Sequence, residues 1–211
     1  MTKNFWEENA AAWARVIQEN TLASRAITNT ALINLISQKN ITSVLDVGCG
    51  EGWLASQLSP STQYLGIDGS ENLIDIAKNT HSSEFKHVSY DKISSGAWST
   101  EGKFAAAVFN FALLDEDILG LLKNIQNSLI SDGFVIIQTL HPCFVLSPYQ
   151  DGWNKEDFKS MAVPFSGHMP WYGRTLSSWV KLFAEAGLKL QETLEPQSGD
   201  KPSSIIFVLQ K

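Results

Sequence analysis

The sequence predicts a doubly wound α/β sheet, and three observations lead to this prediction. Short β-rich runs alternate with amphipathic helical patterns from residue 43 onward, as expected for parallel strands joined by helical crossovers. The first β-rich run ends in a glycine-rich turn, at the position where open α/β sheets bind ligands. The last two β-rich runs have no helical pattern between them, so we expect them to pair antiparallel.

The elements follow from the periodicity of apolar residues. Residues 4–18 and 22–37 carry apolar side chains at helical spacing and predict an N-terminal helical cap, residues 1–40. The expected strands share short apolar, β-rich runs and occupy 43–47, 64–67, 86–89, 105–110, 134–139, 189–194 and 205–210. The expected helices between them occupy 51–58, 71–78, 117–130 and 176–186.

The helix ends have their own signals. Ser70 can cap the helix that follows it by accepting a hydrogen bond from a free N–H group. Gly133 and Gly187 stand where a helix commonly ends, after 117–130 and 176–186 respectively. The inward face expected for the last helix consists of Leu176, Trp179, Val180 and Phe183.

Residues 143–174 show no periodic pattern and are too long for an ordinary connection, so we expect a functional lid there. The segment is rich in aromatic residues: Phe144, Tyr149, Trp153, Phe158, Phe165, Trp171 and Tyr172. Because small-molecule pockets are mostly apolar, this composition predicts an aromatic-lined binding site, unless the rings merely pack the lid onto the sheet. We expect the whole chain, residues 1–211, to form a single domain.

Composition and charge exclude several classes of protein. A net charge of −6 argues against a protein that mainly grips phosphate backbones. Cys49 and Cys143 are too few and too far apart for a disulfide scaffold, and no Cys/His cluster has the spacing of a metal site. Residues 1–8 lack the apolar core of a signal peptide, and no apolar run is long enough to span a bilayer. We therefore expect a cytoplasmic protein.

The glycine-rich turn reads Gly48-Cys49-Gly50-Glu51-Gly52 and is followed by Trp53. Trp53 occupies the third-glycine position of the dinucleotide fingerprint, where a bulky side chain opposes close packing against a pyrophosphate. Asp46, inside the preceding strand, would repel a pyrophosphate but would suit a cationic amino group. Asp68 ends the second strand, where a carboxylate can accept hydrogen bonds from both hydroxyls of a ribose.

These residues resemble the class I S-adenosylmethionine-dependent methyltransferases over residues 22–211. The matching segments share the family's order along the chain and read VLDVGCGEG at 44–52, YLGIDGS at 64–70, SYDKI at 89–93, FNFALL at 109–114 and LISDGFVIIQT at 129–139. The resemblance implies a seven-stranded, mostly parallel, Rossmann-like sheet with an antiparallel last strand. It implies S-adenosylmethionine as the cofactor, with S-adenosylhomocysteine as the product.

The resemblance also implies cofactor-binding residues. The methionine end of the cofactor would lie against Asp46, Gly48, Cys49 and Gly50, with its carboxylate on Arg25. The ribose would lie against Asp68, Gly69 and Ser70, and the adenine against Asp91 and the main chain of Lys92. The sulfonium end would be flanked by Asn110 and Phe111. Structural alternatives exist: Asp91 as a turn residue, Asn110 as an ordinary strand end and Arg25 as a surface or ion-paired residue.

The acceptor side offers three candidates for a general base. His141 follows the strand run 134–139, and His168 and Tyr172 lie in the predicted lid. A histidine at a strand end can instead form a structural hydrogen bond with a neighbouring loop. Arg174 could pair with an acidic group of the substrate or hold the lid through an acidic side chain, and the sequence leaves both possibilities open.

The resulting prediction is methyl transfer to an oxygen or nitrogen of a small, partly apolar molecule. Relatives that methylate exocyclic nitrogens of bases carry two prolines after the fourth strand, and those that methylate base carbons carry a cysteine there. This chain has Asn110-Phe111-Ala112-Leu113 at that place, which disfavours nucleic acid as the acceptor. There are two rival hypotheses. One is a non-catalytic module that binds the cofactor. The other is a nucleotide-cofactor oxidoreductase, which Trp53 and Asp46 disfavour.

Overall fold

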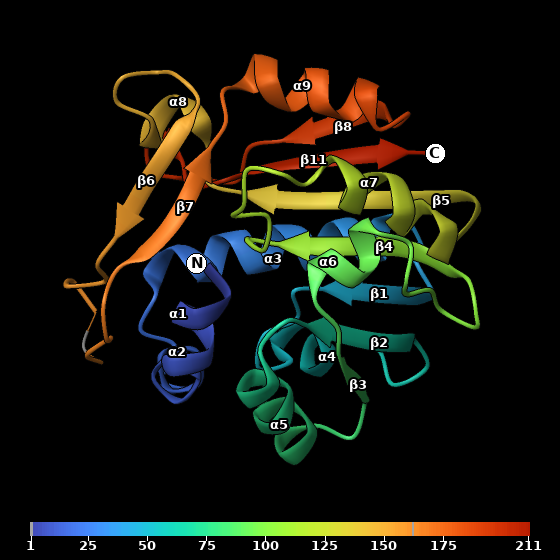
Figure 1. Cartoon of the computed structure of the whole chain (residues 1–211), viewed down its shortest axis with the longest axis horizontal. Helices are drawn as coiled ribbons and strands as arrows, with labels where there is room; N and C mark the ends of the chain where they lie inside the picture. The colour runs from blue at the N-terminus through green and yellow to red at the C-terminus, as the bar shows by residue number, and fades with distance from the viewer. Residues whose placement is uncertain (1, 162) are drawn as a thin grey trace.

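The chain is built around one seven-stranded sheet (Figure 1), seen in a computed structural model that describes residues 2–161 and 163–211. The strands are β1 (Ser43–Val47), β2 (Gln63–Asp68), β3 (Glu84–His87), β4 (Phe104–Asn110), β5 (Leu129–Thr139), β8 (Lys189–Leu194) and β11 (Ile205–Gln210). Their order is β3-β2-β1-β4-β5-β11-β8, and β11 runs antiparallel to both of its neighbours. The predicted fold class, including the antiparallel last strand, is confirmed.

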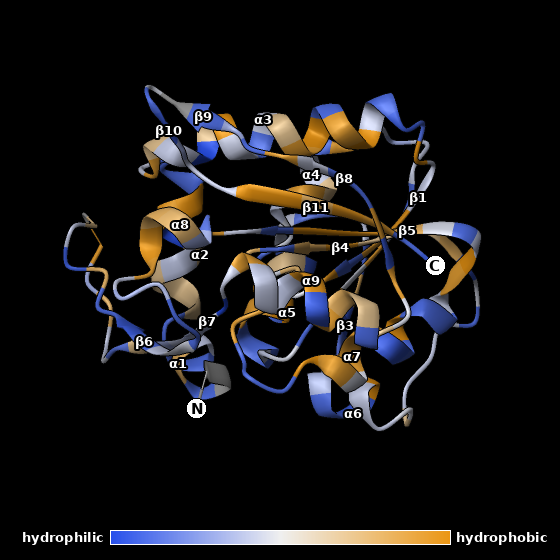
Figure 2. Cartoon of the chain, turned by 90° about the horizontal axis from the view of Figure 1, so that it is seen from above, coloured by the Kyte–Doolittle hydropathy of each residue, from blue (hydrophilic) through white to orange (hydrophobic). Residues whose placement is uncertain are grey.

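Helices cover both faces of the sheet (Figure 2). One face packs against α3 (Ala23–Gln38) and α4 (Trp53–Gln57), through Leu32, Leu35 and Leu54. The other packs against α6 (Tyr90–Ser94), α7 (Leu119–Ile125) and α9 (Leu176–Glu185), through Ile93, Leu121 and Phe183. With both faces covered, β1, β4 and the second half of β5 are largely buried, which explains their nearly continuous apolar sequence.

The predicted helix over residues 4–18 is two helices, α1 (Thr2–Glu8) and α2 (Ala10–Gln18), which meet at Asn9. The Asn9 side chain donates hydrogen bonds to the carbonyls of Phe5 (2.8 Å) and Ser166 (3.0 Å). It also accepts a hydrogen bond from the Ser166 N–H at 2.7 Å. This buried amide therefore ties the N-terminal helices to the loop before β7 (Met169–Gly173), a contact that helical periodicity cannot predict.

The predicted helix over 117–130 exists but is shorter than expected, and the prediction that it ends at Gly133 is wrong. The α-helix covers only Leu119–Ile125, a 3-10 turn follows, and β5 already begins at Leu129. The Gln126 side chain donates to the carbonyls of Leu122 and Ala186, both at 2.9 Å, and so satisfies two main-chain groups where the helices end. Gly133 lies inside β5, where a Cβ atom would stand 2.9 Å from Cβ of Leu129.

The structure confirms the predicted helix α9 and most of its predicted inward face, but corrects one residue of that face. Thr175 caps it by accepting from the Ser178 N–H, and Trp179 and Phe183 are buried. Val180, predicted on the inward face, is 49% exposed. The cap predicted for α5 (Glu71–Thr80) is confirmed, since Ser70 Oγ accepts from the Leu73 N–H.

Residues 143–174 contain regular structure. After the short helix α8 (Pro142–Val145), β6 (Gly152–Glu156) and β7 form an antiparallel hairpin, which we call the lid hairpin. The hairpin lies beside α1 (Figure 1). Several aromatic residues of the segment pack on α1: the ring of Phe5 lies 5.7 Å from Phe158 and 6.1 Å from Phe165.

A second hairpin, of β9 (Gln197–Ser198) and β10 (Lys201–Pro202), joins β8 to β11. Within the described ranges, the helices are all too short or too polar to cross a membrane.

Candidate active site

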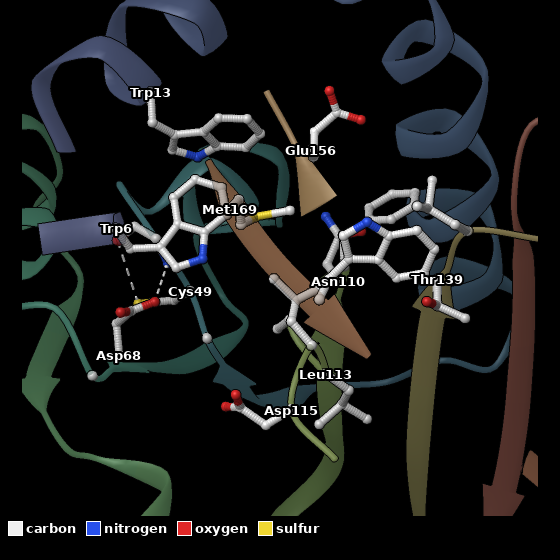
Figure 3. Close-up of a pocket in the computed structure, with 18 of the residues that line it drawn as sticks. Trp6, Trp13, Cys49, Asp68, Asn110, Leu113, Asp115, Thr139, Glu156 and Met169 are labelled. Carbon is white, nitrogen blue, oxygen red and sulfur yellow. Dashed lines mark hydrogen bonds between the residues drawn. The ribbon is translucent and has the colours of Figure 1, made fainter. Parts of the chain in front are cut away.

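A cavity of about 410 Å³ lies at the carboxyl ends of β1, β2, β4 and β5. Its walls also include α1–α3 and the lid hairpin, so segments from both ends of the sequence enclose it. Figure 3 shows Trp6 and Trp13, from the N-terminal helices, together with Asp68 of β2 and Asn110 of β4 around this space. This is the place where an open α/β sheet is expected to bind a ligand.

The glycine loop after β1 is held in a conformation that requires glycine at Gly48. This residue has a φ of +77°, and a Cβ atom there would lie 2.5 Å from Cβ of Ala112 and 2.6 Å from the Tyr90 hydroxyl oxygen. The N–H groups of Gly48 and Cys49 donate to the Ile67 carbonyl of β2 at 2.8 and 3.0 Å. The loop is thus fixed to β2, and Gly48, Cys49 and Gly50 line the cavity.

Asp68 is held rigidly where β2 ends. Its Oδ2 accepts from the Gly50 N–H at 2.9 Å, and its Oδ1 accepts from the Ser70 N–H at 2.8 Å. Burial raises the pKa of this carboxyl, while these main-chain donors lower it. A carboxylate has about four acceptor sites, so Asp68 keeps acceptor capacity for a ligand beside these main-chain donors. Asp68, Gly69 and Ser70 all line the cavity.

Asp46 lies in the same wall, buried at the end of β1. Burial raises its pKa to about 7, and the negative charges of Asp68 and Glu51 act in the same direction. The Tyr64 hydroxyl donates to Oδ2 of Asp46 at 2.7 Å and opposes this rise. A cationic group placed beside Asp46 would stabilise the carboxylate.

The ends of β4 and β5 supply polar atoms to the cavity. Asn110 lines it, and the Asn110 Oδ1 atom is buried without a hydrogen-bond partner among the described residues. Phe111, the next residue, has a φ of +55°, which is unusual for a side chain of this size and marks local strain. Buried polar atoms normally find partners, so Asn110 is where a ligand can satisfy the protein.

Of Asp91 and Lys92, the two residues of α6 predicted to lie against the adenine, only one lines the cavity. Asp91 lines the cavity. Lys92 is not among the lining residues, and its N–H donates to the Ser89 carbonyl at 3.1 Å inside the first turn of α6. The main chain of Lys92 is therefore occupied by the helix itself, which corrects its assignment.

The cavity wall formed by α1, α2 and α3, together with the adjoining glycine loop, contains residues that the sequence did not reveal as site residues. Arg25, which was predicted, lines the cavity and lies over the Trp13 ring at 5.1 Å. Trp6, Trp13 and Glu51 line it as well. The spacing of Trp6 and Trp13 predicts one apolar helical face, but no pattern in the sequence indicates which surface that face covers.

Glu7 connects this wall to the strand ends. Its Oε2 accepts from Ser70 Oγ at 2.6 Å, and its main-chain carbonyl accepts from Asn72 Nδ2 at 3.0 Å. The helix α1 is thus anchored at the N-terminus of α5, next to Asp68. A carboxylate in this position is favoured by the helix dipole.

Two of the three predicted base candidates lie outside the cavity lining. His141 is buried, but its Nε2 is 2.6 Å from Glu195 Oε1 and its ring lies 4.9 Å from that of Phe144. His141 stands at the N-cap of α8, where the chain has turned away from the strand end, so its contacts fit the structural alternative. His168 is exposed, just before β7. Tyr172 does line the cavity.

Comparison with known proteins identifies the family. A family model described as a methyltransferase domain matches residues 5–193. A demethylmenaquinone methyltransferase from Lactococcus lactis subsp. lactis (strain IL1403) is 30% identical over 170 residues, which make up 77% of this chain and 60% of that protein. The match therefore spans less than two thirds of that relative's length.

Solved structures agree in fold. The magnesium protoporphyrin IX methyltransferase of Synechocystis PCC 6803, solved with bound S-adenosylhomocysteine, superposes with a TM-score of 0.69 at 12% identity over 99% of this chain and 97% of that one. An S-adenosylmethionine-dependent methyltransferase from Mesorhizobium loti superposes with a TM-score of 0.61 at 18% identity, over 80% and 90% of the two chains.

The sheet order, the glycine loop and the two strand-end acids define a Rossmann-like methyltransferase. The chain belongs to the class I S-adenosylmethionine-dependent methyltransferase family. The enzyme class and the cofactor predicted from the sequence are those of this family, and the predicted resemblance is confirmed.

Proposed function

We propose that this protein transfers the methyl group of S-adenosylmethionine to an oxygen or nitrogen of a small, partly apolar molecule. One observation carries the proposal. A single cavity joins the strand-end acids Asp46 and Asp68, and Asp91 of α6, to the apolar and aromatic residues of the lid hairpin. It therefore offers a polar end for the cofactor and an apolar end for the acceptor.

The polar end fits the cofactor in charge and in hydrogen bonding. The lining acids are Asp46, Glu51, Asp68, Asp91, Asp115 and Glu156, whereas Arg25 and Arg174 are the basic residues among the described lining. The cofactor carries a sulfonium, an amino group and a carboxylate, so an acidic wall favours its net positive charge. The unpartnered Asn110 Oδ1 is a further atom that a ligand can satisfy.

The residues have separate roles in this proposal. Asp68 accepts hydrogen bonds from the ribose hydroxyls, with Gly69 and Ser70 beside the sugar. Asp46 and the glycine loop hold the methionine amino group, and Arg25 holds its carboxylate. Asp91 lies toward the adenine, and Asn110 and Phe111 flank the sulfonium end.

When bound, S-adenosylmethionine supplies an electrophilic methyl group, and the protein supplies position and electrostatics. The lid hairpin and the N-terminal helices shield the acceptor from water and orient it for an in-line displacement. Tyr172 is the candidate hydrogen-bond partner for the acceptor, because it is the one of the three predicted base candidates that lines the cavity. Burial and the nearby charges of Glu116 and Asp151 raise the pKa of its hydroxyl, so it donates a hydrogen bond and does not act as a base.

The acceptor is proposed to be a small molecule and not a nucleic acid. The net charge of −6 and the segment Asn110-Phe111-Ala112-Leu113 support this choice. The names of two similar proteins indicate small acceptors, a demethylated menaquinone in one and magnesium protoporphyrin IX in the other.

Thermal unfolding with S-adenosylmethionine, S-adenosylhomocysteine and NAD, each added separately, tests the cofactor. A ligand at about 100 times its Kd adds about 2.7 kcal/mol of stability, which raises the Tm of a chain of this size by about 5–11 °C. We expect this shift with both adenosyl ligands and none with NAD. A shift with NAD alone would support the oxidoreductase, and cofactor binding without turnover on a broad acceptor panel would support the non-catalytic module.

A further inference from the structure

We propose that Arg174 binds a carboxylate of the acceptor, so that the substrate of this enzyme is an acid with an apolar, aromatic-sized body. The inference rests on the proposed methyltransferase function and narrows its substrate class. Arg174 follows the last residue of β7 and immediately precedes the N-cap residue of α9. It lines the cavity and is only 6% exposed.

The guanidinium of Arg174 is held in a fixed position. Its Nη2 donates to the main-chain carbonyls of Asp115 (2.7 Å) and Glu116 in the loop after β4. Its Cζ lies 4.9 Å from the ring centre of Tyr172 and 5.2 Å from that of Trp179. These four contacts orient the group but do not neutralise it, because carbonyl oxygens and aromatic rings carry no net charge.

The opposite nitrogen, Nη1, is buried and has no hydrogen-bond partner among the described residues. Leaving a buried charged donor unpaired is costly, and native proteins rarely do so without a functional reason. A carboxylate fits this donor well, since arginine pairs with carboxylates through short, charge-assisted hydrogen bonds. Nη2 acts as the structural anchor, and Nη1 is left for a ligand.

The acidic side chains around Arg174 also have other partners. Glu116 Oε2 accepts from the indole N–H of Trp153 at 3.2 Å, and Asp151 Oδ1 accepts from the Thr175 N–H at 2.7 Å. Burial lowers the pKa of Arg174, and these two carboxylates, together with Asp115 and Tyr172, oppose that fall. They keep the guanidinium charged in a buried position without occupying Nη1.

The position of Arg174 points to the acceptor and not to the cofactor. Arg25 lies on α3, against the glycine-loop side of the cavity, where we placed the carboxylate of the cofactor. Arg174 lies on the lid side, and the neighbouring Tyr172 N–H donates to the Leu114 carbonyl at 2.8 Å, close after Asn110 in the β4 loop. An anion on Arg174 would therefore lie near the reacting end of the cofactor.

The surroundings of Arg174 define the remainder of the ligand. The lining on this side is mostly apolar, with Asp115 and Glu156 as its acidic residues, and includes Leu113, Leu114, Leu146, Met161, Met169 and Trp171. Flexible methionines and a broad indole suit a ring system or another compact apolar body. A carboxylate is already ionised at neutral pH, so it can pair with Arg174 without a histidine to take up its proton. The described lining of the cavity contains no histidine.

Matched pairs of an acid and its amide test the proposal. Naphthalene-1-acetate and indole-3-acetate are compared with their primary amides, together with further arylacetates, by thermal shift and calorimetry in the presence of saturating S-adenosylhomocysteine. In the wild-type chain we expect acids to bind about 10-fold or more tightly than their amides, as for a charge-assisted hydrogen bond. In Arg174→Gln we expect this ratio to fall to about 1, with the shift caused by S-adenosylhomocysteine retained.

Arg15→Gln is the matched control, because Arg15 is exposed on α2 and pairs with Glu19 at 2.6 Å, away from the lining. Arg174→Lys keeps the charge and covers the case in which the glutamine variant does not fold; it should reduce the ratio without reaching 1. Equal binding of every acid and its amide by the wild-type chain would overturn the proposal, and so would a ratio in Arg174→Gln or Arg174→Lys that is as large as in the wild type. Failure of S-adenosylhomocysteine to stabilise the wild-type chain would instead count against the proposed function.

Discussion

The hydroxyl of Tyr64 donates a hydrogen bond of 2.7 Å to Oδ2 of Asp46, from β2 to the neighbouring strand β1. Asp46 is buried in the wall of the cavity, and burial raises its pKa to about 7. The Tyr64 hydrogen bond lowers this pKa by favouring the carboxylate. The charge of Asp46 therefore changes near neutral pH, and several predictions depend on it.

The first prediction is a pH-dependent cofactor affinity. A cationic amino group beside Asp46 favours its carboxylate, so binding below about pH 7 must displace a proton and the affinity falls by up to about 10-fold per pH unit. Calorimetry with S-adenosylhomocysteine between about pH 8 and pH 5.5 measures the slope, and buffers of different ionisation enthalpy measure the proton release. In Tyr64→Phe the fall should begin at a higher pH. An affinity that is constant across this range would remove Asp46 from the amino-group site.

The second prediction concerns stability without ligand. The pKa of Asp46 is raised from 3.8 to about 7, so its contribution to stability is present in full below about pH 4 and is lost as pH rises through 7. Asp46→Asn should be more stable than wild type at pH 8, by at most about 4 kcal/mol, and this gain should shrink as pH falls. Urea unfolding of both chains at pH 8 and pH 5 checks the sign. A gain that is equal at both pH values would contradict it.

The third prediction concerns Asp68. Asp68→Ala removes the proposed ribose contact together with the acceptors for the Gly50 and Ser70 N–H groups, so cofactor affinity should fall by about 10- to 150-fold. Asp75→Ala makes the same change at an exposed position on α5 and should bind normally. Titration calorimetry compares the two variants. Unchanged affinity in Asp68→Ala would mean that the ribose lies elsewhere.

The fourth prediction concerns the anchor of the N-terminal helices. Glu7→Gln removes the charge that accepts from Ser70 Oγ and lies at the N-terminus of α5, an interaction of about 0.3–1 kcal/mol. Because α1 carries Trp6 over the cavity, S-adenosylhomocysteine should dissociate a few times faster. Stopped-flow Trp fluorescence measures this rate. Glu8→Gln, at the exposed neighbouring residue, is the control, and equal rates in both variants would contradict the anchor.

The fifth prediction concerns His141. Its side chain is buried against Glu195 and Phe144 and is not part of the cavity lining, so His141→Ala should lower the free energy of unfolding by about 1–3 kcal/mol. Cofactor affinity should remain within twofold of the wild type. Chemical denaturation and calorimetry measure both quantities. A stable variant that has lost methyl transfer would restore His141 as a candidate base.

Most strands could be predicted closely because they are short β-rich runs between turn residues. Residues 43–47, 189–194 and 205–210 were predicted with the bounds that β1, β8 and β11 have. The strand predicted over 86–89 is observed earlier in the chain, as β3 at Glu84–His87, because the chain turns into α6 at Tyr90. The predicted helix over 117–130 ran too far because Leu129 and Ile130, which are apolar at helical spacing, belong to the strand β5.

The residues of the candidate site also fall into those that the sequence could predict and those that it could not. Asp46 and Asp68 could be predicted because the carboxyl ends of parallel strands lie at one edge of the sheet, so their positions follow from local sequence. Trp6, Trp13 and the orientation of Arg174 could not, because they depend on how helices and a hairpin pack over that edge. His141 was misassigned because its place after a strand end does not reveal that the side chain turns to Glu195.

The sequence by itself determined the family, the order of strands and helices, and the acids and glycines that mark the cofactor end of the cavity. These features are local: a strand, its terminal carboxylate and the following turn are adjacent in the chain. The tertiary structure alone decided which side chains close the cavity and which predicted bases face it. Those contacts join residues far apart in sequence, such as Glu7 with Ser70 and Arg174 with the carbonyl of Asp115, and only packing brings them together.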